Sequence, residues 1–238
     1  MNQFFVTGIL FFAPLVGAFV ALQLKRDKED YFKLVLSFSG AFLFSVMLLH
    51  LLPEIFQSEG VNAGLFMLLG FFIQVFLEQA THGIEHGHFH HHSENNTFLI
   101  SLFVGLSVHS FFDGIAATAP ITNAEHAPAS LLYGIALHKI PEGFALASIF
   151  LFSNYTRNKT IIVVALFSLI APVGAMISSY IQENNIHAYP MLLAIVAGSL
   201  LHVSTTILFE SEKSGMHSFS FKKILTIIFA VALSLLTI

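Results

Sequence analysis

The sequence predicts an all-α, polytopic membrane protein, and three observations carry that prediction. First, 55% of the 238 residues are hydrophobic and only 10% are charged, whereas a water-soluble domain carries about 25% charged residues. Second, the apolar residues form stretches long enough to cross a bilayer, which takes about 20 residues per helix. Third, the connections between these stretches are short. We therefore expect a single transmembrane domain over residues 1–238, embedded in the lipid bilayer, with no nucleic-acid partner.

Eight apolar stretches are predicted to be transmembrane helices. Their approximate bounds are 2–24, 32–55, 61–81, 98–119, 128–152, 160–182, 189–209 and 222–238. The connection at 82–97 is rich in histidine, and we expect it to form a cytoplasmic loop within the transmembrane domain. Any function must then lie among the spans or in this loop.

The positive charges indicate how the chain is oriented, because cytoplasmic loops are enriched in lysine and arginine. Nine of the ten such residues lie in or beside three alternate connections. They are Lys25, Arg26, Lys28, Lys33, Arg157, Lys159, Lys213, Lys222 and Lys223. With eight spans, this distribution places both termini outside the cytoplasm. The expected location is the cell (inner) membrane.

Spans four and five contain two segments with the same pattern. Each segment has a glycine, a histidine four residues later, an acid four residues after that, and then a second glycine. The segments are Gly105, His109, Asp113, Gly114 and Gly134, His138, Glu142, Gly143. Four-residue spacing places the histidine and the acid on one face of a helix, one turn apart. Ionisable groups inside a membrane are costly, so they indicate a functional site.

Two such helices facing each other would present two imidazoles and two carboxylates. Mixed nitrogen and oxygen ligands suit zinc and its first-row neighbours, whereas calcium and magnesium prefer oxygen ligands alone. We therefore predict a divalent metal site formed by His109, Asp113, His138 and Glu142. The alternative is that these polar residues only hold helices together, and it is disfavoured because the pattern occurs twice at midspan.

These segments resemble the ZIP (Zrt-/Irt-like) family of divalent metal transporters, of bacterial type. The residues that carry the resemblance are His109, Ser110, Asp113 and Gly114 in span four, and His138, Lys139, Pro141, Glu142 and Gly143 in span five. Similar matches occur in other spans, among them His50, Pro53, Glu54, Glu78, Ala171, Pro172, Gly174, Gly198 and Glu210.

The resemblance implies an eight-helix transporter with inverted three-helix repeats around a central pair, spans four and five. It also implies that His109, Asp113, His138 and Glu142 bind the transported metal, and that the protein forms a homodimer. Some members of that family hold two metals, but at the positions of the additional ligands this sequence has Ser110, Lys139 and Ala171. The resemblance therefore implies a single metal here.

The net charge of the site also favours a single bound metal. Asp113, Glu142 and an ionised Lys139 sum to minus one. One divalent ion brings the site to plus one and two bring it to plus three, and uncompensated charge is costly at low dielectric. Lys139 lies three residues before Glu142, close enough to pair with it in the absence of metal. A plain salt bridge is the alternative role for Lys139.

Other histidines are candidates for metal entry or exit. Six lie in the connection at 82–97: His82, His86, His88, His90, His91 and His92. Such a tract binds metal by composition alone, so we expect a receiving loop of modest affinity, with an inert linker as the alternative. His50 and Glu54 in span two have two alternative interpretations: a role in metal entry, or a polar contact at the end of the helix. His202 in span seven is either a hydrogen-bonded packing residue or a metal ligand.

The predicted function is uptake of a divalent cation toward the cytoplasm. Zn²⁺ is the first candidate, and Fe²⁺, Mn²⁺ and Cd²⁺ suit the same ligands. An intramembrane zinc-dependent hydrolase would need an open coordination position and a general base, and the sequence contains no His-Glu-x-x-His motif. A sensor that binds metal without transporting it is a further alternative. We predict no catalytic residues.

Overall fold

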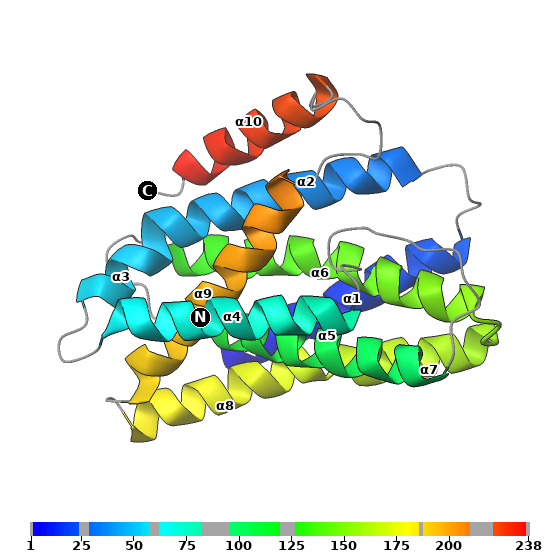
Figure 1. The fold of residues 1–238 in the computed structure, drawn as a ribbon, viewed down its shortest axis with the longest axis horizontal. Helices are drawn as coiled ribbons and strands as arrows, with labels where there is room; N and C mark the ends of the chain where they lie inside the picture. The colour runs from blue at the N-terminus through cyan, green and yellow to red at the C-terminus, as the bar shows by residue number, and fades with distance from the viewer. Residues whose placement is uncertain are drawn as a thin grey trace.

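The computed structural model describes residues 2–23, 29–57, 62–81, 96–119, 127–185, 188–209 and 221–236. Within these ranges every regular element is a helix, as Figure 1 shows, and this confirms the predicted all-α class. The helices are α1 (Gln3–Gln23), α2 (Glu29–Val46), α3 (Leu52–Gln57), α4 (Ala63–Thr81), α5 (Asn96–Ala116), α6 (Ala127–Phe152), α7 (Arg157–Ser168), α8 (Ile170–Asn184), α9 (Ala188–Phe209) and α10 (Phe221–Leu235). A π-helical segment, η2 (Met47–Leu51), joins α2 to α3.

Each of the eight predicted spans coincides with a helical segment. Span two consists of α2, η2 and α3, and span six consists of α7 and α8 with an interruption at Leu169. Among the described residues, six segments are long and apolar enough to cross a membrane: Gln3–Gln23, Leu34–Gln57, Asn96–Ala116, Ala129–Phe152, Arg157–Asn184 and Ala188–Leu208. The chain is thus a multi-pass membrane protein. The apolar part of α4 and the whole of α10 are shorter, so their crossing of the membrane stays a prediction, as does the inverted repeat.

The helices form a bundle in which α5 and α6 have neighbours on several sides. The most extensive contacts are those between α1 and α6, between α4 and α9, and between α5 and α8. In Figure 1, α10 lies along α2 at one edge of the bundle, and α8 lies at the opposite edge. Helix α6 also contacts α2, and α5 also contacts α4. The two helices with the repeated polar pattern are therefore enclosed by the others.

The outer surface of the bundle is apolar. Large hydrophobic side chains such as Phe12, Phe19, Phe76, Tyr180 and Phe229 are exposed. A water-soluble protein rarely exposes so many large apolar side chains in contiguous patches. Lipid tails are the natural neighbours of this surface, which agrees with the composition.

Helices α1 and α6 approach to backbone contact beside the predicted ligand Glu142. A Cβ atom added to Gly143 would lie 2.1 Å from the carbonyl oxygen of Pro14, and one added to Gly17 would lie 1.9 Å from that of Ile140. Only residues without a side chain allow this approach. The glycine that follows the acid in the span-five pattern is thus explained by the packing of α1.

Helices α5 and α8 repeat the same arrangement beside Asp113. A Cβ atom at Gly114 would lie 2.0 Å from the carbonyl oxygen of Ala171, and one at Gly174 would lie 2.2 Å from that of Phe111. In both helices of the central pair, therefore, the glycine after the acid is the point at which an outer helix packs directly on the backbone. This contact fixes the helical turn from which the carboxylate projects.

Candidate metal site

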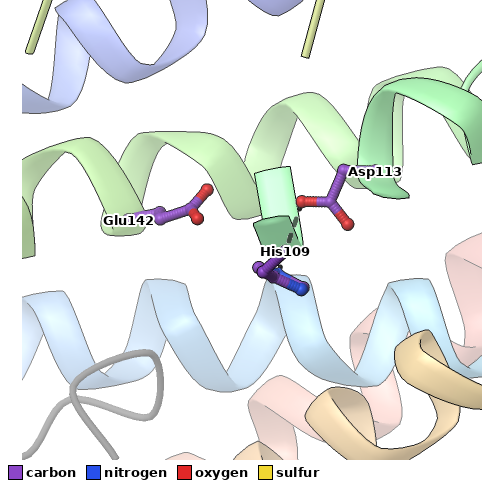
Figure 2. Close-up of side chains that lie close together, drawn as sticks. All are labelled: His109, Asp113 and Glu142. Atoms are coloured by element: carbon purple, nitrogen blue, oxygen red, sulfur yellow. Dashed lines mark ion pairs between the residues drawn. The ribbon is translucent and has the colours of Figure 1, made fainter. Parts of the chain in front are cut away.

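Three of the four predicted ligands meet between α5 and α6. His109 and Asp113 lie one turn apart on α5, and Glu142 faces them from α6, as Figure 2 shows. One ligand atom from each of the three lies within 4.8 Å of the other two. The side chains are buried, with residue exposures of 0%, 0% and 3%. The Nε2 atom of His109 lies 3.4 Å from Oδ2 of Asp113. A buried imidazole with two carboxylates is a ligand set that zinc accepts.

His138, the fourth predicted ligand, lies beside this group without being part of it. It is buried on α6, but the group of ligand atoms within 4.8 Å contains only the other three residues. The ring of His138 packs edge-to-face against that of His109, with centroids 5.8 Å apart and planes at 86°. The structure therefore brings all four residues into one region, and it brings ligand atoms of His109, Asp113 and Glu142 within 4.8 Å of one another. Their roles as ligands stay a prediction.

Lys139 projects into the same site. Its ammonium lies 2.5 Å from Oε2 of Glu142, which confirms the expected pair, and 2.6 Å from Oδ2 of Asp113. The lysine is fully buried, and its ammonium lies over the ring of Phe167, 5.5 Å from the ring centroid. Because Asp113 is on α5 and Lys139 on α6, this ion pair joins the two helices of the central pair.

Neither the Asp113–Lys139 pair nor the contact with Phe167 was predicted from the sequence. The repeated pattern indicated that α5 and α6 face each other, and this was a signal for the Asp113–Lys139 pair. No signal pointed to Phe167, because it is one of 27 phenylalanines and lies on α7, outside the repeated pattern.

Several buried polar atoms of the site make no hydrogen bond with any of the described residues. They are both ring nitrogens of His109, both carboxylate oxygens of Asp113 and Oε1 of Glu142, although Oδ2 of Asp113 has its ion pair with Lys139. Buried polar atoms in folded proteins almost always have a partner. A neutral imidazole has one nitrogen with an available lone pair, so His109 offers one ligand atom beside the carboxylate oxygens. A buried cluster of such atoms inside a membrane protein therefore favours a cationic ligand.

The other two positions associated with a second metal are also buried. Ser110 lies on α5 next to His109, and Ala171 lies in the first turn of α8. The side chain of Ala171 has no ligand atom, and its carbonyl oxygen packs against Gly114. Of the three positions, only Lys139 carries a charge, and that charge is positive. A single-metal site remains the prediction.

Span two has irregular geometry at the predicted entry residue. His50 is buried and lies inside the π-helical segment Met47–Leu51, and Glu54 follows in the first turn of α3. Short π-helical segments inside α-helices are frequent at functional sites. The entry role of His50 and Glu54 stays a prediction.

His202 contacts an acidic residue of a neighbouring helix. Its Nε2 atom lies at hydrogen-bonding distance from Oε2 of Glu78 on α4, and the ring packs edge-on against Phe71. One turn away, the hydroxyl of Ser199 donates to Oε1 of Gln74 at 2.8 Å. These contacts agree with the interpretation of His202 as a hydrogen-bonded packing residue. The six histidines predicted to form the receiving loop, His82, His86, His88, His90, His91 and His92, lie outside the described residues.

Comparison with known proteins identifies the family. A sequence model of the ZIP zinc transporter family matches residues 85–236, well over half of the chain. The zinc transporter ZIP9 of Micropogonias undulatus is 28% identical over 166 residues, which cover 65% of this chain and 53% of that protein. The zinc transporter YKE4 of Saccharomyces cerevisiae is 26% identical over 213 residues, which cover 76% of this chain and 62% of that protein.

The similarity is extensive along this chain, although the chain spans only about half the length of the first of these relatives. The proteins of this family are transporters and not enzymes. The intramembrane hydrolase considered above therefore has no support. Because the family model matches most of the chain, including both helices of the central pair, the chain belongs to the ZIP zinc transporter family.

Proposed function

We propose that the protein transports a divalent metal cation across the membrane toward the cytoplasm, with Zn²⁺ as the principal substrate. The observation that carries the proposal is the buried cluster of His109, Asp113 and Glu142 between α5 and α6. Membership of the ZIP zinc transporter family supports it independently. Fe²⁺, Mn²⁺ and Cd²⁺ are further candidate substrates, because imidazole and carboxylate ligands accept them too.

In this proposal the cation is bound by His109, Asp113, His138 and Glu142. Two carboxylates supply the charge that compensates a dication, and two imidazoles supply neutral nitrogen ligands. Lys139 has to release at least one carboxylate as the metal binds, because its ammonium lies at hydrogen-bonding distance from both. Its positive charge also opposes a second metal, so one ion is bound at a time.

The distribution of positive charges supports the orientation of the chain in this proposal. Lysine and arginine cluster in alternate connections, which favours both termini outside the cytoplasm and the connection at 82–97 inside. Uptake is the proposed direction because the histidine-rich connection would then lie on the side that receives the metal. The cation passes His50 and Glu54 on entry and binds in the central site. A shift of spans four and five relative to the other helices then opens the site to the inside, and the ion leaves toward the histidine-rich connection. The location is the cell (inner) membrane, and the assembly is a homodimer.

Flux measured in reconstituted vesicles tests this proposal. Purified protein in liposomes is expected to take up Zn²⁺ in a protein-dependent manner, and competing Fe²⁺, Mn²⁺ and Cd²⁺ rank the substrates. The double variant Asp113→Ala with Glu142→Ala is expected to abolish uptake, because it removes both anionic ligands. Gly8→Ala is a matched control, since a Cβ at that position meets nothing within 4 Å.

Two outcomes would overturn the proposal. Undiminished Zn²⁺ uptake in the double variant would exclude the central site as the route. Tight Zn²⁺ binding by the folded wild-type protein without any flux would instead identify a metal sensor.

A further inference from the structure

Lys139 determines the net charge of the central site. Its ammonium is fully buried and pairs with Asp113 on one helix and Glu142 on the next, at 2.6 and 2.5 Å. The ring of Phe167 covers it. These contacts hold the positive charge between the two carboxylates that are the proposed anionic ligands of the transported cation.

We propose that Lys139 is a tethered counter-ion for the return half of a carrier cycle. It keeps the site at one unit of charge in both the loaded and the empty form. The inference rests on the proposed function, and it assigns to Lys139 a role in the rate of transport that is distinct from holding α5 against α6.

The charges of the two forms follow from the residues of the site. With neutral histidines, the two carboxylates and the ammonium sum to minus one in the empty form, and a bound dication changes this to plus one. Without the ammonium, the same site would carry minus two when empty and zero when loaded. With the lysine, the empty and the loaded site therefore carry net charges of equal size and opposite sign.

Equal net charges in the two forms matter because the free energy of placing charge in a low-dielectric medium rises with the square of that charge. A site at minus two costs about four times as much to move through the membrane interior as a site at minus one. Net transport requires both the loaded and the empty site to move, so the slower movement limits it. The ammonium lowers the barrier to movement of the empty site, which would otherwise be the larger one, and raises the barrier to movement of the loaded site.

Loss of the ammonium is consequently expected to change two transport modes in opposite directions. Net uptake needs the empty site to return and should slow. Exchange of external for internal metal uses only the loaded site, which would become neutral, and should be as fast as in the wild type or faster. Damage to the fold, or loss of a plain salt bridge between the helices, would slow both modes together.

The experiment compares net Zn²⁺ uptake into metal-free vesicles with Zn²⁺ exchange into vesicles preloaded with Zn²⁺, at zero membrane potential. In Lys139→Met the ratio of net uptake to exchange is expected to fall by about tenfold or more, because uncompensated charge is costly inside the membrane. Lys139→Arg keeps the charge and should keep the wild-type ratio. The double variant Lys139→Met with Glu142→Gln restores the empty site to minus one and should regain most of the ratio at weaker Zn²⁺ affinity.

The double variant also keeps the test valid if Lys139→Met alone folds poorly, because it leaves no uncompensated pair of carboxylates. An equal fall of net uptake and exchange in Lys139→Met, or a double variant whose ratio stays low, would overturn the role of Lys139 while leaving the proposed function intact. Absence of Zn²⁺ flux in both modes for the wild-type protein would overturn the proposed function itself, and this inference with it.

Discussion

Gly143 packs against Pro14 so closely that a Cβ atom on the glycine would lie 2.1 Å from the proline carbonyl oxygen. The glycine immediately follows Glu142, so the contact between α1 and α6 determines where that carboxylate stands. Gly17 makes the reciprocal contact from α1, with its added Cβ 1.9 Å from the carbonyl oxygen of Ile140. The position of a proposed metal ligand thus depends on two residues that have no side chain.

Substitution of Gly17 tests this dependence. Gly17→Ala is expected to destabilise the protein by about 1–3 kcal/mol, because the methyl group forces the two backbones apart, and to lower Zn²⁺ uptake by displacing Glu142. Gly8→Ala on the same helix is the matched control and should be neutral or slightly stabilising, since alanine is the better helix former. Thermal unfolding in detergent and uptake in vesicles measure both effects. Equal stability of the two variants would show that α1 does not constrain α6.

The two histidines of the site are expected to differ in importance. His109 belongs to the group of ligand atoms within 4.8 Å of one another, whereas His138 contacts it through the ring of His109. His109→Ala should therefore weaken Zn²⁺ affinity more than His138→Ala does. Competition with a metal indicator on the purified, folded variants gives both affinities. If His138→Ala has the larger effect, the site rearranges around His138 when metal binds.

Acid is expected to weaken metal uptake. The imidazoles and carboxylates must be deprotonated to bind a cation, so protons compete with metal and binding releases protons. The half-saturating Zn²⁺ concentration should rise as the pH falls from about 7.5 to 5.5, because the concentration of the competing proton rises while the metal ligands stay the same. The measurement uses vesicles with equal pH on both sides, which removes any contribution from a proton gradient. An affinity that stays constant over this range would show that protons do not compete with the metal for the site.

The contact between His202 and Glu78 is expected to couple α9 to α4. Hydrogen bonds between helices in membranes contribute about 0.6 kcal/mol on average, and a coupling energy of this size is expected from a double-mutant cycle with His202→Ala and Glu78→Ala. Unfolding of the four proteins in detergent gives the coupling energy. If the cycle shows no coupling while His202→Ala impairs Zn²⁺ uptake, His202 acts on the metal path and not in packing.

Much of the fold could be predicted because the bilayer restricts the choices. A stretch of about 20 apolar residues has to be helical in lipid, and each of the eight predicted stretches coincides with a helical segment. The interruption at Leu169 and the π-helical segment around His50 were not predicted. Hydropathy measures the apolar character of a stretch and does not describe such local irregularities within a helix.

The site could be predicted in part because its pattern is local. Spacing of four residues along one helix places His109 next to Asp113, and the structure has them 3.4 Å apart. The contacts of Lys139 with Asp113 and Phe167 run between helices, and no spacing along the chain encodes which residues meet across such an interface. The partners of Gly17 and of His202 were unpredictable for the same reason.

Anomalous X-ray scattering from crystals of the protein grown with Cd²⁺ shows where the metal binds without reference to activity. One strong peak is expected between α5 and α6, bounded by His109, Asp113, His138 and Glu142, with the Lys139 ammonium withdrawn from at least one carboxylate. A crystal with Cd²⁺ bound elsewhere and the ion pairs of Lys139 intact would contradict the proposed metal site.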